Sequence, residues 1–139
     1  MGRLLAIDHG EKRIGLALSD PNKIISKPLK TISFSNYDNL SIDLIEIIER
    51  YEIEKLIIGL PIGMHGANTL QTDKVEDFTN YLKNKIDIPI IMFDERLSSV
   101  SAKKSLVEQG IKTGHNKSKI DDTAAAIFLQ HYLDQLNYK

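Results

Sequence analysis

The chain has 139 residues, of which 42% are hydrophobic and 27% charged, as in an ordinary globular domain. It has no cysteine, which excludes disulfides and thiolate metal sites, so a bound metal needs oxygen or imidazole ligands. The net charge of -1 excludes a uniformly basic protein and leaves nucleic-acid binding to a local basic patch. The sequence shows neither a membrane-spanning run nor a signal-peptide pattern, which predicts a single cytoplasmic domain over residues 1–139.

Two short apolar runs open the chain, and they predict a β-hairpin with strands at Leu4–Ile7 and Ile14–Leu18. Asp8 ends the first run, so its carboxylate is expected at the rim of a rigid sheet, where functional sites are often built. Gly10 and Gly15 would leave the neighbouring backbone open to close approach by a ligand.

The following runs predict a third strand, then a helix, a strand, a helix, a strand and two helices. Their expected ranges are strand 27–34, helix 40–52, strand 55–61, loop 62–69, helix 75–82, strand 88–93, a helix from 98 or 99, a polar stretch 110–119 and a helix 121–136. An antiparallel meander followed by crossover connections predicts an α/β fold with a five-stranded mixed sheet and helices on both faces.

Three acidic residues fall at the ends of predicted elements. Asp8 follows the first strand, Glu95 follows the fifth strand, and Asp121 opens the last helix. Carboxylates repel one another unless a cation lies between them, and an oxygen-only ligand set suits Mg²⁺ or Mn²⁺. Such ions activate water and stabilise the leaving oxygen when a phosphodiester bond is hydrolysed. The three acids together therefore predict a metal-dependent nuclease site.

Each acid also has an ordinary structural explanation. Asp8 could belong to a turn, because Asp and Gly are common turn residues. Asp94 and Glu95 could form a solvated pair at a strand end, and Asp121 stands where a helix N-cap is expected. Only the combination of the three favours a site.

A local basic patch is predicted beside these acids. Lys112, Lys117 and Lys119 fall within ten residues, with no acid between residues 110 and 119. Such a patch fits the backbone phosphates of a nucleic acid. The alternative is a solvated flexible loop, given its glycine, serine and asparagine content.

Several of these stretches form a recognisable series. They are residues 5–10, 13–17 and 19–20, then 58–61 with Gly66, then 93–97, and finally 119–121 with 124–125 and 129–133. In this order and spacing they resemble the YqgF (RuvX) family of pre-16S rRNA nucleases and Holliday junction resolvase-like proteins. The resemblance implies an RNase H-like fold and metal-dependent cleavage of a phosphodiester bond, with Asp8, Glu95 and Asp121 at the family's acidic positions.

The sequence departs from the family pattern at two places near the acids. Asp122 is an extra acid, so the third metal ligand is either Asp121 or Asp122. Glu11 stands where family members often carry threonine, which adds a negative charge near the metals.

The leading hypothesis is a nuclease that processes the 5′ end of precursor 16S rRNA. Asp8 and Asp121 would hold Mg²⁺ or Mn²⁺, Glu95 would hold metal or orient water, and Arg13 and Arg96 would neutralise phosphate charge. A monomer or weak homodimer is expected, since a stable dimer would favour paired cuts.

Three other functions compete with this hypothesis. One is a Holliday junction resolvase that cuts branched DNA with the same site, and another is a non-catalytic RNA-binding module. The third is an ATP-binding module of the actin type, which needs a second Asp-x-Gly turn in a second lobe that this chain does not supply.

Overall fold

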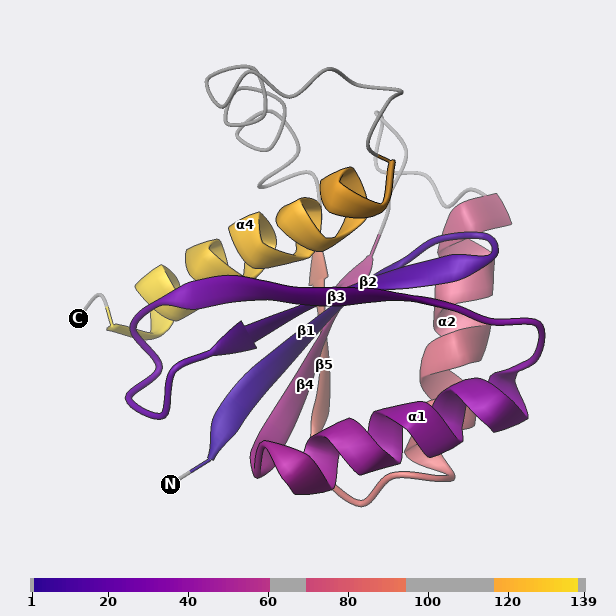
Figure 1. Cartoon of the computed structure of the whole chain (residues 1–139), viewed down its shortest axis with the longest axis horizontal. Coiled ribbons are helices and arrows are strands. Elements are labelled where there is room, and N and C mark those ends of the chain that lie inside the picture. The colour runs from indigo at the N-terminus through magenta and orange to yellow at the C-terminus, as the bar shows by residue number, and fades with distance from the viewer. Residues whose placement is uncertain (1, 61–69, 95–116, 138–139) are drawn as a thin grey trace.

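The computed structural model describes residues 2–60, 70–94 and 117–137, with residues 117–123 described by their backbone alone (Figure 1). Its strands are β1 (Arg3–His9), β2 (Arg13–Ser19), β3 (Ser26–Ser33), β4 (Ile53–Leu60) and β5 (Ile90–Asp94). They form one five-stranded sheet in the order β3-β2-β1-β4-β5. The pairs β1–β2 and β2–β3 are antiparallel, whereas β1–β4 and β4–β5 are parallel, which confirms the predicted mixed sheet.

Helices cover both faces of this sheet, as predicted. The helices α1 (Tyr37–Arg50) and α2 (Leu70–Lys83) lie on one face, and α4 (Lys117–Asn137) lies on the other (Figure 1). No helix in the described ranges is long and apolar enough to span a membrane.

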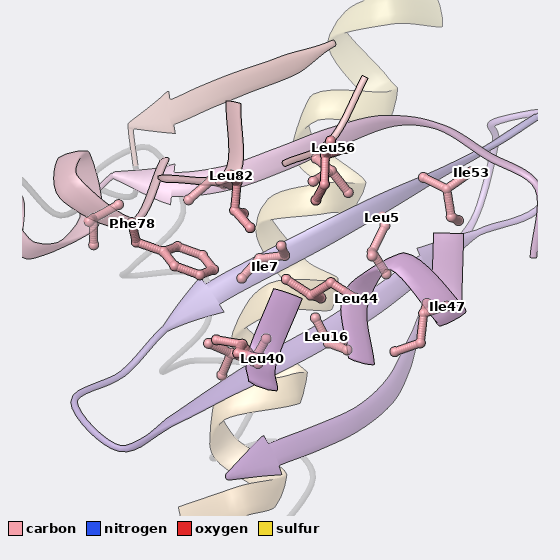
Figure 2. Close-up of a cluster of buried hydrophobic side chains, with 14 residues drawn as sticks. Leu5, Ile7, Leu16, Leu40, Leu44, Ile47, Ile53, Leu56, Phe78 and Leu82 are labelled. Atoms are coloured by element: carbon pink, nitrogen blue, oxygen red, sulfur yellow. The ribbon is translucent and has the colours of Figure 1, made fainter. Parts of the chain in front are cut away.

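The alternation of side chains along the strands divides the core into two layers. Leu5 and Ile7 of β1 belong to the layer under α1 and α2, together with Phe78. Figure 2 shows this layer, in which leucine and isoleucine side chains of α1 and α2 meet those of the sheet. Leu4 and Ala6 point the other way and belong to the layer under α4. The strand β1 is therefore buried on both faces, as its continuous apolar run indicates.

Local signals explain where α1 begins and ends. The side-chain oxygen of Asn36 accepts a hydrogen bond from the backbone N–H of Asn39 at 2.8 Å, which makes Asn36 the N-cap. At the other end, the backbone N–H of Tyr51 still bonds to the carbonyl of Ile47, and Glu52 takes a positive φ of 54° that turns the chain into β4.

Some predicted boundaries were wrong. The strand β5 begins at Ile90 rather than at residue 88, since Pro89 has no N–H for the ladder and only its carbonyl accepts from Leu56. The helix α4 begins at Lys117, so Asp121 lies one turn inside it and is not its N-cap. Nothing between Lys117 and Asp121 breaks a helix, which explains the earlier start. The helix predicted from residue 98 or 99 and the loop 62–69 lie outside the described residues.

A buried serine ties β1 to the end of β2 and gives a testable prediction. The Ser19 hydroxyl, 1% exposed, accepts a hydrogen bond from the backbone N–H of Leu4 at 2.8 Å. Replacement by alanine leaves this buried N–H without its partner, so Ser19→Ala is expected to lower the free energy of unfolding by about 2 kcal/mol. Urea denaturation measures this loss, and the exposed Ser33→Ala serves as the control, with a change within about 0.5 kcal/mol. Equal effects of the two substitutions would contradict the prediction.

Candidate active site

Asp8 lies on the central strand of the sheet and on the face that α4 covers. It is one residue inside β1, since the strand continues to His9 rather than ending at Asp8 as predicted. Leu4 and Ala6 belong to the layer under α4, and the period of two gives Asp8 the same face. Its side chain is half-buried. A carboxylate on a central strand has little freedom to move, which suits a residue that must hold a fixed position.

Glycines lie on both sides of Asp8. Gly15 of β2 is its direct partner in the antiparallel pair. On the other side, β1 and β4 pair Ile7 with Ile58, which brings Gly59 beside Asp8. Both glycines belong by alternation to the α4 face, so neither neighbouring strand places a side chain next to the carboxylate. The role expected for Gly15 fits this arrangement, whereas Gly59 was missed because only the register of β4 reveals its place.

Asp94, the described acid at the end of β5, does not share the face of Asp8. Ile91 and Phe93 belong to the layer under α4, so Asp94, the last residue of β5, points to the opposite face. Asp94 therefore lies on the other side of the sheet from Asp8. Glu95 and Arg96 lie outside the described residues.

The N-terminal half of α4 runs toward the end of the sheet that carries Asp8. The other half is tied to the β2–β3 turn, because Gln130 donates to the carbonyl of Ile24 and Asn137 donates to that of Lys23, each at 2.8 Å. The N-terminal part of α4 therefore lies toward the C-terminal end of β1, as Figure 1 shows. Among the side chains that the structure describes, no group of three acids or histidines could hold a metal, and neither Glu95 nor the side chain of Asp121 is among them.

Arg13 and Glu11 flank the tight turn between β1 and β2. The Gly10 N–H donates to the Arg13 carbonyl at 2.8 Å, and a Cβ at Gly10 would lie 2.7 Å from that oxygen, so the turn requires glycine. Arg13 is half-buried and shares its face with Gly15 and Asp8. Glu11 is exposed and forms an ion pair with Lys74 of α2 at 3.4 Å. The structure thus brings one of the predicted phosphate-binding cations to the face of Asp8.

The predicted lysine patch is described only in part. Lys112 lies outside the described residues, whereas Lys117 and Lys119 fall in the first turn of α4 rather than in a loop. Their backbone is helical, so the predicted polar loop ends before residue 117.

His9, for which the sequence predicts no functional role, fixes the end of β1 from the face under α1 and α2. Its ring is 7% exposed and packs against Phe34, Tyr37 and Phe78. The Gln71 amide donates to the His9 carbonyl at 3.0 Å and lies 3.4 Å from Nδ1, while the Tyr37 hydroxyl lies 3.3 Å from Nε2. The contacts connect residues 62 positions apart, so no local sequence signal could have identified them.

Burial makes His9 neutral at neutral pH. The pKa of His9 falls from 6.5 to about 4, mainly because burial removes water from the ring. A backbone hydrogen bond opposes this shift, and the nearby Lys74 ammonium adds to it. In a neutral ring one nitrogen accepts and the other donates. Because the Gln71 amide can only donate from its nitrogen, Nδ1 is assigned as the acceptor and Nε2–H as the donor to Tyr37.

Comparison with known proteins identifies the family. The family model RuvX, described as Holliday junction resolvase, matches residues 2–135. A protein of Maridesulfovibrio salexigens is 40% identical over 131 residues, which cover 94% of this chain and 97% of the relative. One of Roseiflexus sp. is 39% identical over 133 residues, covering 96% and 94%. Both carry the name "Putative pre-16S rRNA nuclease".

Solved structures support the fold. Thermus thermophilus RuvC in complex with a Holliday junction substrate is similar with a TM-score of 0.59 at 13% identity, covering 98% of this chain and 96% of RuvC. The fowlpox virus resolvase with junction DNA gives a TM-score of 0.56 at 16% identity, covering 97% and 99%. At these identities the likeness establishes the RNase H-like fold alone. The family model and the relatives at 39% identity or more, each spanning nearly all of the sequence, show that this chain belongs to the RuvX family of nucleases, which are hydrolases acting on ester bonds.

Proposed function

We propose that the protein is a metal-dependent nuclease that cuts precursor 16S rRNA at its 5′ end, with Asp8 as the central acid of its site. The observation that carries this proposal is the placement of Asp8 on the central strand, between Gly15 and Gly59, on the face under α4. Because glycine has no side chain, neither neighbouring strand places a side chain beside this carboxylate, which supports its use as a metal ligand.

The residues available fit Mg²⁺ or Mn²⁺. The chain has no cysteine, and the acids expected here supply only oxygen, which these ions prefer. Glu95 lies outside the described residues, so its place in the ligand set rests on membership of the RuvX family. Residue 121 lies one turn before Ala125, which is buried against the sheet. The proposed ligand set is therefore Asp8, Glu95 and Asp121, with Asp122 as the alternative to Asp121.

The roles proposed for these residues follow from their charges. When bound, a divalent ion activates water and stabilises the leaving oxygen of a phosphodiester bond. Asp8 and Asp121 hold the ion, and Glu95 holds it or orients the water. Arg13 and Arg96, with a basic patch of Lys112, Lys117 and Lys119, neutralise the phosphates of the bound strand.

The choice of RNA as substrate rests on the names of the relatives. A single domain over residues 1–139, acting in the cytoplasm as a monomer or weak homodimer, fits that role. The second candidate is cleavage of branched DNA, which the description of the family model and the likeness to two resolvases bound to junction DNA favour.

A cleavage assay tests the proposal. Wild-type protein is incubated with a labelled 5′-extended 16S rRNA precursor and, separately, with a four-way DNA junction, each with Mg²⁺, Mn²⁺ or EDTA. Metal-dependent cutting of the RNA alone supports the proposal, and cutting of the junction alone replaces it with the resolvase function. Binding of RNA without cutting in any metal would leave a non-catalytic RNA-binding module.

A further inference from the structure

A pocket lies at the same end of β1 as Asp8, on the opposite face of the sheet. It has a volume of ≈ 360 Å³ and is lined by His9, Glu11, Phe34, Ser35, Asn36, Tyr37 and Lys74. His9 follows Asp8 directly in the strand, so the pocket and the candidate active site share one strand end. A nucleic-acid strand that passes Asp8 and crosses the β1–β2 turn would reach this pocket.

The inner wall of the pocket is aromatic and well supported. The rings of Phe34 and Tyr37 are half-buried, with centroids 5.8 Å apart and planes inclined at 37°. Behind them, Phe78 lies 5.1 Å from Tyr37 and His9 lies 5.8 Å from Phe34. These neighbours restrict the two rings before any ligand arrives, which reduces the entropy lost on binding.

The rim of the pocket is polar and carries one cation. Ser35 and Asn36 are exposed at the edge. Lys74 and Glu11 form an exposed ion pair at 3.4 Å, with side chains 48% and 75% exposed, and such a pair contributes little stability. Lys74 can therefore exchange Glu11 for a phosphate at small cost.

We propose that this pocket binds one unpaired nucleobase of the strand that is cut at Asp8. The base stacks on Phe34 and Tyr37, and the Lys74 ammonium contacts an adjacent phosphate. Flat aromatic walls beside a cation are the features with which proteins hold single-stranded nucleic acids. A base inside a duplex has both faces covered by its neighbours, so the pocket selects single-stranded substrate. The inference rests on the proposed function and adds the substrate class to it.

The test combines ring removal with base removal. An RNA of twelve nucleotides, and copies with one abasic position each, are bound in EDTA to Asp8→Asn protein, whose cleavage is expected to be at least about 10³-fold slower. The same RNAs are bound to the double variant with Phe34→Leu. Fluorescence anisotropy gives each Kd. Phe34→Leu is expected to weaken binding of the intact RNA about tenfold. At one position, removal of the base weakens binding to Asp8→Asn by a similar factor and has no further effect on the double variant.

Two controls separate the possible outcomes. Tyr132→Leu removes an equally half-buried aromatic ring on the α4 face and should leave Kd unchanged. Phe34→Trp keeps a stacking surface and should keep the affinity, which a purely structural role of Phe34 would not predict. If the effects of Phe34→Leu and of base removal on Kd multiply at every position of the RNA, the pocket proposal is overturned. Cleavage of RNA by the wild-type protein would still support the proposed function. If wild type neither binds nor cuts RNA or DNA, the proposed function fails as well.

Discussion

Asp8→Asn is expected to lower the rate of metal-dependent cleavage by about 10³-fold or more. The amide keeps the size of the carboxylate but loses its charge, so it binds a divalent ion poorly. Stabilisation of the transition state by such an ion is worth several kcal/mol, which corresponds to this factor. Single-turnover cleavage of the preferred substrate at saturating protein measures the loss, and the fold should survive because Asp8 is half-buried on a strand held from both sides.

Asp94→Asn is the matched control for this experiment. It makes the same chemical change at the same end of the sheet, but on the opposite face. Its cleavage rate should stay within about threefold of wild type, below the 10-fold change that 1.4 kcal/mol produces. Equal losses in the two variants would show that the face assigned to Asp8 is not the catalytic one. A parallel comparison of Asp121→Asn with Asp122→Asn identifies the third ligand.

Acidification should destabilise the protein through His9 between pH 6.5 and about 4. The unfolded chain takes up a proton with the ordinary pKa of 6.5, whereas burial lowers the pKa in the folded state to about 4. The contribution of His9 to stability is thus fully present above pH 6.5 and is lost progressively as the pH falls to about 4. The full loss is about 3 kcal/mol, from the difference between the two pKa values.

His9→Phe provides the reference for that measurement. The ring lies among Phe34, Tyr37 and Phe78, so phenylalanine fits the site but cannot titrate. Urea denaturation in EDTA at several pH values gives the free energy of unfolding of both proteins. Their difference should change by about 3 kcal/mol across the window, since acidic groups such as Asp20 contribute equally to both. A difference that does not vary with pH would show that His9 is not held neutral in the fold.

The sheet could be predicted because its signals are local. Apolar runs bounded by glycine, proline and polar residues marked β1, β2, β4 and β5, and alternation of apolar and polar residues marked β3. Their order along the chain limited the possible topologies. The boundaries at Pro89 and Lys117 were missed although their signals are also local: proline has no N–H for the ladder, and no helix breaker stands between residues 117 and 121.

The environment of Asp8 was predictable only in part. Its place near a strand end came from the sequence alone, but the pairing that brings Gly59 beside it joins residues about fifty positions apart. Asp94 and Asp8 lie on opposite faces of the sheet because side chains alternate along a strand. This alternation assigns a face to Asp94 only after Phe93 has been placed in the layer under α4. The contact of Gln71 with His9 is non-local in the same way.

The order of assembly has a consequence for biosynthesis. The α4 face of the sheet is complete once β5 has formed, but Phe128, Leu129 and Leu133 cover it only when α4 has been made. A growing chain therefore exposes an apolar sheet surface that favours association with chaperones or other chains. Because α4 also carries Asp121, a proposed metal ligand, the helix that covers this apolar surface is the one that would complete the proposed site.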